Sequence, residues 1–218
     1  MHRLLFEKKG NAVYISHLDL MRTFQRAFLR AGLQVKHTEG FNPHVYLSIA
    51  LPLSIGAESD YELLDFELLS GASLDEVSER LNACLPTGIR VLQCYEAARK
   101  LKEIAWLDIA GTFEYDCGVT EDLLDALRLF FGQESIVISK RSKKGIREFD
   151  VAPCIEGIAF RCGTDNDVGV SLLASAQDPA LNPELLVDAL RQLKPELVPD
   201  FAQFRRLRAL DGQLQVFR

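Results

Sequence analysis

Each half of the sequence contains two stretches of helical periodicity, and extended apolar runs lie before, between and after them. Residues suited to cap a helix precede the helical stretches: Ser16, Ser73, Thr120 and Asn182. The helices are expected at residues 17–31, 73–85, 120–132 and 182–194. The strands are expected at residues 3–16 (as one strand or a tight hairpin), 44–51, 61–69, 88–97, 106–118, 135–141, 147–163, 167–175 and 204–218.

This order of elements predicts an α+β protein. Read from the N-terminus, the first half follows the pattern strand, helix, strand, strand, helix, strand, which is the order of a ferredoxin-like unit, and the second half repeats that order with residues 167–175 as another strand. We therefore expect two tandem ferredoxin-like β-α-β-β-α-β units. The charged segment at residues 96–103 is the expected boundary, with an N-terminal domain over residues 1–98 and a C-terminal domain over residues 104–218.

Composition excludes several classes of protein. Hydrophobic residues make up 48% of the 218 residues, and no apolar run is long enough to span a membrane. The N-terminus becomes charged too early for a secretory signal. The five cysteines are far apart and include no C-x-x-C pair, which argues against a disulfide framework or a structural zinc site. We expect a cytoplasmic protein with reduced thiols and no bound cofactor or metal.

The charge of the chain is unevenly distributed. Its formal net charge of −6 argues against unselective coating of nucleic acid. Residues 58–79 nevertheless contain eight acidic side chains and no basic one, whereas residues 140–147 contain five basic side chains and no acidic one. We expect the basic segment to form an exposed loop that binds anions, or else a solvated hairpin tip.

The first expected helix has a core face and a basic face. Ser16 is placed to cap its N-terminus, with Asp19 closing a capping box, and Gly32 is placed to end it. The core face contains Leu20, Phe24, Ala27, Phe28 and Ala31. The opposite face contains Arg22, Arg26 and Arg30, spaced four residues apart. These arginines form either a solvated face or a grip for phosphate or carboxylate groups, which arginine binds in a bidentate manner.

Histidines extend this basic face into a candidate site. His17 lies at the start of the helix, and His44 follows the turn residues Asn42 and Pro43. We expect Phe41 to anchor that turn in the core while Asn42 and His44 point outward. A metal site built from His17, Asp19, His37 and His44 has no supporting spacing, and the sequence lacks a nucleophile elbow, a Walker loop and a dinucleotide fingerprint.

The residues predicted to bind an anion or RNA are therefore the outward-facing basic and polar ones. They are His17, Arg22, Arg26, Arg30, Asn42, His44, Lys140, Arg141, Lys143, Lys144 and Arg147. The first six are expected to converge on one surface.

The segment YISHLDLMRTFQRAFLRAGLQVKHTEGFNPH, followed by LSIALPLSIGAESDYELLDFEL, closely resembles the bacterial radical-SAM-linked protein family. In that family, a domain of unknown function is encoded beside a cobalamin-type radical SAM protein or fused behind it. The likeness is specific over residues 1–95 and looser over KRSKKGIREFDVAP. Residues 34–37 depart from the family pattern, which sets His37 apart from the expected site residues. The resemblance implies an accessory role with a radical SAM partner, and RNA as a ligand.

Three functions remain open from the sequence. The first is a non-catalytic module that binds RNA or another phosphate-bearing partner and works with a separately encoded radical SAM enzyme. The second is an RNA-processing enzyme that uses His17 or His44 beside the arginines. The third is a protein-interaction domain whose acidic run at residues 58–79 docks on a basic partner.

Overall fold

The structure is a computed structural model that describes residues 1–142, 145–163 and 166–218. Within these ranges it contains four α-helices, and the strands of each unit pair antiparallel, which confirms the α+β class. The chain divides into two compact units, one formed by residues 1–103 with Arg218 and the other by residues 104–217. None of the helices in the described ranges has the length and apolar character needed to cross a membrane.

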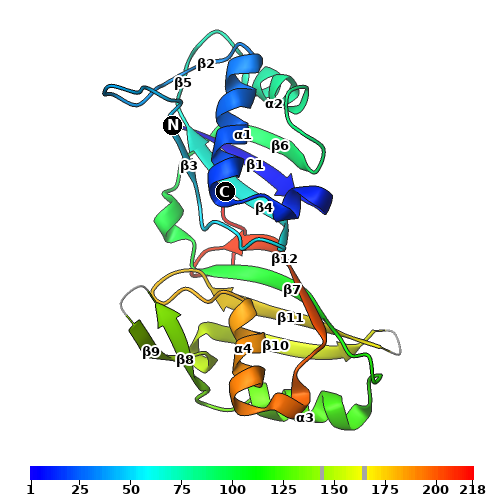
Figure 1. Cartoon of the computed structure of the whole chain (residues 1–218). Coiled ribbons are helices and arrows are strands. Elements are labelled where there is room, and N and C mark those ends of the chain that lie inside the picture. The colour runs from blue at the N-terminus through cyan, green and yellow to red at the C-terminus, as the bar shows by residue number, and fades with distance from the viewer. Residues whose placement is uncertain (143–144, 164–165) are drawn as a thin grey trace. The chain divides into compact units, whose positions relative to one another are not determined.

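The first unit is a sheet with two helices (Figure 1). Its elements are β1 (His2–Lys8), α1 (His17–Arg30), β2 (Gln34–Val35), β3 (Leu47–Ile49), β4 (Glu58–Phe66), β5 (Leu68–Ser70), α2 (Leu74–Asn82) and β6 (Ile89–Glu96). The strands of its sheet follow the order β3-β4-β1-β6, and β2 pairs with β5 separately. Of the two alternatives for residues 3–16, the strand is confirmed for His2–Lys8 and the tight hairpin is wrong, because a 3₁₀ helix at Gly10–Tyr14 follows β1.

Aromatic side chains join α1 to this sheet. Phe24 of α1 meets Phe6 of β1 edge-on, with ring centroids 4.8 Å apart. One turn later, Phe28 packs against Phe66 of β4 at 4.9 Å. All four rings are fully buried, and aromatic pairs in this geometry add stability beyond the area they bury. The helix is therefore held by one face, and its opposite face points away from the sheet.

The opposite side of β1 contains a buried ion pair. Arg3 is 1% exposed, and its Nε and Nη2 atoms donate to the two carboxylate oxygens of Asp65 on β4 at 2.6 and 3.0 Å. Nη2 also donates to the carbonyl oxygen of Arg99 at 2.9 Å. Arg3 and Asp65 thus form an ion pair between neighbouring strands of the sheet, and each charge depends on the other.

The second unit contains the remaining two helices and a sheet. Its elements are β7 (Trp106–Glu114), α3 (Glu121–Phe131), β8 (Val137–Ser142), β9 (Gly145–Asp150), β10 (Ile155–Cys162), β11 (Asp167–Ser175), α4 (Glu184–Leu193) and β12 (Phe201–Leu210). The sheet has the order β10-β11-β7-β12. The expected single strand at residues 147–163 is wrong, since a 3₁₀ helix at Ala152–Cys154 separates β9 from β10.

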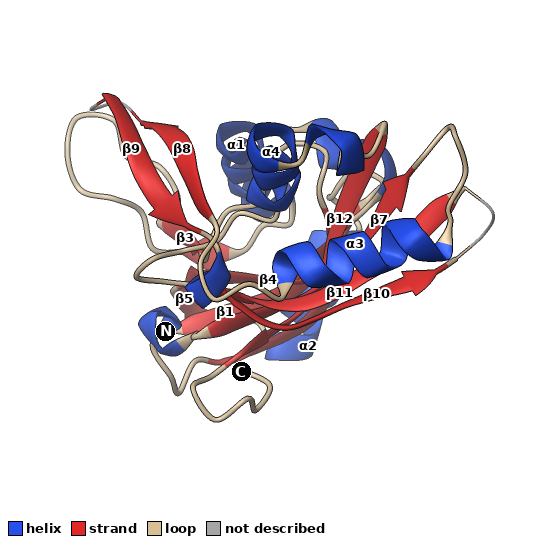
Figure 2. Ribbon diagram, turned by 90° about the horizontal axis from the view of Figure 1, so that it is seen from below, coloured by secondary structure: helices blue, strands red, loops and turns tan. Residues whose placement is uncertain are grey.

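Phenylalanines also form the centre of this second core. Phe113 of β7 lies between Phe160 and Phe204, at centroid distances of 6.4 and 6.0 Å. Phe131 at the end of α3 stacks on Phe160 at 5.5 Å. Figure 2 shows α3 running alongside β10 and β11, as these contacts require. The helix stretches predicted here are confirmed, with the Thr120 hydroxyl accepting from the amide of Leu123 at the start of α3.

Strands β8 and β9 form a two-stranded ribbon outside the sheet (Figure 2). At the base of the ribbon, the amide of Val151 donates to the carbonyl of Ile136 at 2.9 Å, so the two ends of the ribbon lie side by side. The side chain of Gln192 on α4 holds the outer edge of β8. It accepts from the Ser139 amide at 2.8 Å and donates to the Ser139 carbonyl at 3.1 Å.

Candidate functional site

The termini of α1 follow from local sequence. The Ser16 hydroxyl accepts from the Asp19 amide at 3.2 Å, which confirms Ser16 as the N-cap. The Asp19 carboxylate accepts from the Ser16 hydroxyl at 2.7 Å. That hydrogen bond and the Arg22 guanidinium lower the pKa of Asp19 below its ordinary value. Gly32 follows the helix with φ +63°, a left-handed conformation that glycine adopts without steric cost.

The two faces of α1 are those expected from the sequence. Leu20, Phe24, Ala27 and Phe28 are buried, whereas Arg22, Arg26 and Arg30 are exposed. Arg22 forms an ion pair with Asp19 at 3.1 Å. Within the described residues, Arg26 and Arg30 form no ion pair. Two of the three guanidinium groups are therefore available to an external anion.

Residues 36–46 form a second wall opposite this face, and we call them the 36–46 hairpin. The amide of Tyr46 donates to the Lys36 carbonyl, and the amide of Thr38 donates to the His44 carbonyl, both at 2.8 Å. The Thr38 hydroxyl also lies 3.1 Å from Nδ1 of His44 and accepts from the His44 amide at 3.2 Å. These contacts fix the imidazole of His44 through Nδ1. In Figure 1 the hairpin extends away from the sheet, beyond β2 and β5.

The tip of this hairpin corrects one expectation. Phe41 does not anchor the turn in the core, because its relative exposure is 111%. The turn is anchored instead by Val45, which is 2% exposed and bridges to His37. Phe41 lies beyond the last cross-strand hydrogen bond, where no second layer of structure can cover a side chain. The exposed position of Phe41 follows from the length of the hairpin, and the hydrophobicity of the residue does not predict that length.

A groove lies between α1 and the 36–46 hairpin, and we call it the α1 groove. It consists of two hollows of about 330 and 450 Å³ that share Arg22, Gln25 and His44. Its lining residues come from both walls: His17, Leu18, Met21, Arg22, Gln25, Arg26, Leu29, His37, Asn42, Pro43, His44 and Val45. Among these described residues none is acidic, so the groove offers cationic and hydrogen-bonding groups on an apolar floor.

The α1 groove brings together five of the residues predicted to bind an anion. His17, Arg22, Arg26, Asn42 and His44 all line it, and His17 and His44 line the same hollow. Arg30 is exposed on the same helix but lines neither of these two hollows. Anion binding by these residues stays a prediction.

Three details of the groove were not predicted from the sequence. His37 lines it, although it was set apart from the site. Gln25 also lines it, and helical spacing would have found this residue because it lies one turn from both Arg22 and Leu29. Nδ1 of His17 is buried and has no hydrogen-bond partner among the described residues, which the sequence does not indicate.

The second predicted basic segment forms part of the β8–β9 ribbon. Lys140 is half-buried, its ammonium lies 4.8 Å from the centre of the Phe149 ring, and it faces Arg147 across the two strands. Arg141 and Arg147 are exposed. Lys143 and Lys144 lie outside the described residues. Like charges that face each other destabilise a ribbon, and a bound anion would relieve that repulsion.

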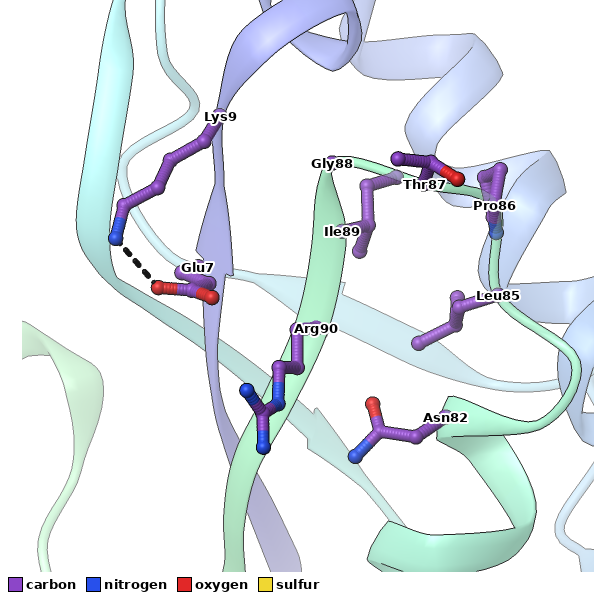
Figure 3. Close-up of a pocket in the computed structure, with 9 residues that line it drawn as sticks. All are labelled: Glu7, Lys9, Asn82, Leu85, Pro86, Thr87, Gly88, Ile89 and Arg90. Carbon is purple, nitrogen blue, oxygen red and sulfur yellow. Dashed lines mark hydrogen bonds and ion pairs between the residues drawn. The ribbon is translucent and has the colours of Figure 1, made fainter.

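Another hollow of the first unit has a structural explanation. It measures about 400 Å³ and contains Lys9, Glu7, Asn82 and Arg90 among its lining residues (Figure 3). Lys9 is already paired with Glu7 at 2.6 Å and with Asp60 at 2.7 Å. The side-chain amide of Asn82 donates to the carbonyl and accepts from the amide of Val91 on β6. Lys9, Glu7 and Asn82 are therefore already occupied by protein groups, so this hollow is a weaker candidate than the α1 groove.

The described part of the chain contains no group of three His, Cys, Asp or Glu side chains placed to hold a metal ion. The metal site considered for His17, Asp19, His37 and His44 therefore gains no support. Of these, His17 and His44 line one hollow and His37 the other, and Asp19 is engaged with Ser16 and Arg22.

Comparisons with known proteins give one family and a distant structural likeness. A family model described as an uncharacterized protein conserved in bacteria (DUF2344) matches residues 2–183. No curated protein sequence matches the chain. Among solved structures, an unknown protein from Galdieria sulphuraria aligns at 9% identity, covering 94% of this chain and 96% of its own, with a TM-score of 0.27.

Proposed function

We propose a function for this chain from the premise that it belongs to the bacterial family DUF2344. The description of that family names no activity, so the proposal rests on the chain's own residues. The α1 groove binds a phosphate-bearing partner, and RNA is the partner we propose. In this proposal the chain is a non-catalytic accessory protein of a separately encoded radical SAM enzyme.

The observation that carries the proposal is the set of donors lining the α1 groove. Arg22 and Arg26 lie one turn apart on α1, and the groove contains no carboxylate among its described lining residues. Guanidinium groups bind phosphate oxygens in a bidentate manner, and nearby amide and imidazole groups add single hydrogen bonds. Asn42 and His44 supply these from the opposite wall. The groove is therefore suited to an anion.

Binding is favoured over catalysis by the surroundings of the histidines. Nδ1 of His44 contacts the Thr38 hydroxyl at 3.1 Å and lies 3.3 Å from the Asn42 carbonyl oxygen. Thr38 is itself occupied by the His44 amide, so it closes the hairpin rather than serving a substrate. No carboxylate among the described residues contacts His17 or His44 to orient it as a general base.

The acidic run at residues 58–79 gives little support to a protein-docking function. Glu62 is 1% exposed. Asp65 is paired with Arg3, and Glu67 is paired with Lys36 at 3.0 Å. Glu76 closes the capping box of α2. Most of these carboxylates serve the first unit itself, so they do not form one free acidic surface.

The fold of the two units and the cellular location of the protein are also part of the proposal. The strand orders β3-β4-β1-β6 and β10-β11-β7-β12, each with two helices in the chain order described above, support an assignment of both units as ferredoxin-like. The cysteines at positions 84, 94, 117, 154 and 162 are all free, which supports a reducing, cytoplasmic location. The radical SAM partner rests on the family resemblance alone.

A binding assay tests the proposal. Fluorescence anisotropy with a labelled single-stranded RNA of about 12 nucleotides, within the usual site sizes for such strands, measures affinity across a salt series. The Arg22→Ala/Arg26→Ala variant is expected to bind more weakly. Its slope of log K against log salt is expected to be smaller by about 1.4, since each phosphate contact on a single strand contributes about 0.7.

A charge-matched variant separates the groove from net charge. Arg80→Ala/Arg90→Ala removes the same two charges from exposed positions of the first unit outside the α1 groove, and it is expected to bind like the unaltered protein. Equal losses in both double variants would contradict the proposal. A denaturing gel of the RNA after incubation tests catalysis, because shortened RNA would show that the chain is an enzyme.

A further inference from the structure

The most exposed aromatic ring among the described residues adjoins the α1 groove. Phe41 has a relative exposure of 111%, so both faces and the edge of its ring are open to solvent. The next residue along the chain, Asn42, lines the groove. Proteins rarely leave a phenylalanine completely uncovered, because burying such a side chain is worth substantial free energy. An uncovered ring beside a cationic groove indicates a contact with a ligand.

The 36–46 hairpin fixes the backbone that carries this ring. Two backbone hydrogen bonds of 2.8 Å close the hairpin, and the Thr38–His44 side-chain contacts close its tip. Gly40 precedes Phe41 with φ +121°, a conformation that L side chains rarely adopt, and so the turn depends on this glycine. The ring is presented by a closed turn, which reduces the entropy lost when a ligand binds.

The length of the α1 groove favours a polymer over a single nucleotide. Its lining residues on α1 run from His17 to Leu29, and twelve helical steps of 1.5 Å cover about 18 Å. The phosphates of one stacked strand advance by about 3.4 Å each along the helix axis, so at most about five phosphates fit within that length. A mononucleotide would leave most of the groove empty.

We propose that the α1 groove and Phe41 together bind single-stranded nucleic acid, with a base stacked on Phe41 and the backbone following Arg22 and Arg26. This inference rests on the proposed function and adds the class of ligand. In a duplex, the bases cover one another's faces, whereas an unpaired base is free to stack on an aromatic ring. Stacking of this kind tolerates any base sequence, so little sequence preference is expected.

The test compares Phe41→Ala with a matched variant, Phe201→Ala, which truncates another exposed phenylalanine in the second unit. Affinities are measured for single-stranded RNA, single-stranded DNA of the same sequence and the corresponding duplex. Phe41→Ala is expected to weaken single-strand binding by about 5- to 150-fold, the effect of losing one stacked base, without changing the salt slope. Duplex binding and the Phe201→Ala variant are expected to show no such loss.

A fluorescence readout reports stacking directly. The chain has a single tryptophan, Trp106, so a Phe41→Trp/Trp106→Phe variant places its only indole at the hairpin tip. Single-stranded oligonucleotides are expected to quench this indole, and the duplex is not. Comparison of RNA with DNA shows whether the ribose 2′-hydroxyl contributes.

The outcomes separate this inference from the proposed function. If Phe41→Ala binds single strands normally while Arg22→Ala/Arg26→Ala does not, the groove binds phosphate and the stacking inference is wrong. If the duplex binds as tightly as the single strand and also depends on Phe41, the single-strand assignment is wrong. If the unaltered protein binds none of the three nucleic acids, both proposals are wrong.

Discussion

Loss of Asp65 is expected to destabilise the first unit far more than loss of a surface carboxylate. Asp65→Ala leaves the guanidinium of Arg3, which is 1% exposed, without the partner that accepts at 2.6 and 3.0 Å. The Arg99 carbonyl at 2.9 Å provides a hydrogen bond but no compensating charge. Breaking a buried pair on one side costs about 3–5 kcal/mol, because the remaining charge stays desolvated.

Equilibrium unfolding in urea, followed by circular dichroism, measures this cost. The fluorescence of Trp106 reports on the second unit and distinguishes unfolding of that unit from unfolding of the first. Glu67→Ala is the control, because it removes the partner of Lys36 from a pair in which both side chains are substantially exposed, and it is expected to change the midpoint little.

A variant with both residues replaced tests whether the cost comes from the unpaired charge. Arg3→Met/Asp65→Leu removes both charges and fills the space with apolar side chains, so its stability is expected to return to within about 1–2 kcal/mol of the unaltered protein. A cost below about 1 kcal/mol for Asp65→Ala would refute this reasoning, since it would mean that water reaches the guanidinium of Arg3.

Three further predictions concern Asn82 and Cys94 of the first unit. Asn82→Ala removes hydrogen bonds of 2.9 and 2.8 Å to the carbonyl and amide of Val91, so the free energy of unfolding in urea should fall by about 1–3 kcal/mol. Glu79→Ala, at an exposed position of the same helix, should leave the urea midpoint unchanged. Burial raises the pKa of Cys94 to about 12, so N-ethylmaleimide at neutral pH should label exposed Cys117 and spare Cys94, as mass spectrometry of peptides will show. The raised pKa of Cys94 also makes the free energy of unfolding fall as pH rises from about 9 towards 12, because the thiol ionises in the unfolded chain before it does so in the folded one. Cys94→Ala should lessen this fall. An identical pH dependence of stability in both proteins would contradict the assignment of the shift to Cys94.

Local sequence predicted the helices well because their signals are local. Ser16 and Thr120 accept from the first-turn amides of α1 and α3, as helix capping requires. The prediction of Asn182 as the N-cap of α4 is wrong, because Pro183 occupies that position, although the Asn182 side chain accepts from the amide of Glu184 at 3.3 Å. Strand boundaries were less predictable, since residues 147–163 keep an extended apolar composition across the 3₁₀ helix that divides them.

The candidate site was predictable only in part. Helical periodicity placed Arg22 and Arg26 on the outer face of α1, and the turn residues before His44 indicated a return of the chain. The exposure of Phe41 depends on how far the hairpin extends past its last backbone hydrogen bond, which is a tertiary property. The inclusion of His37 depends on its bridge to Val45, which brings together residues of two separate segments.

The closed base of the β8–β9 ribbon has a consequence for how this chain can vary. Because the Val151 amide and the Ile136 carbonyl lie 2.9 Å apart, strands β8 and β9 belong to an appendage whose ends already meet. An insertion or deletion within such an appendage leaves the register of β10 against β11 unchanged. The basic ribbon is thus a place where the chain can change in length and charge while the sheet that carries it stays intact.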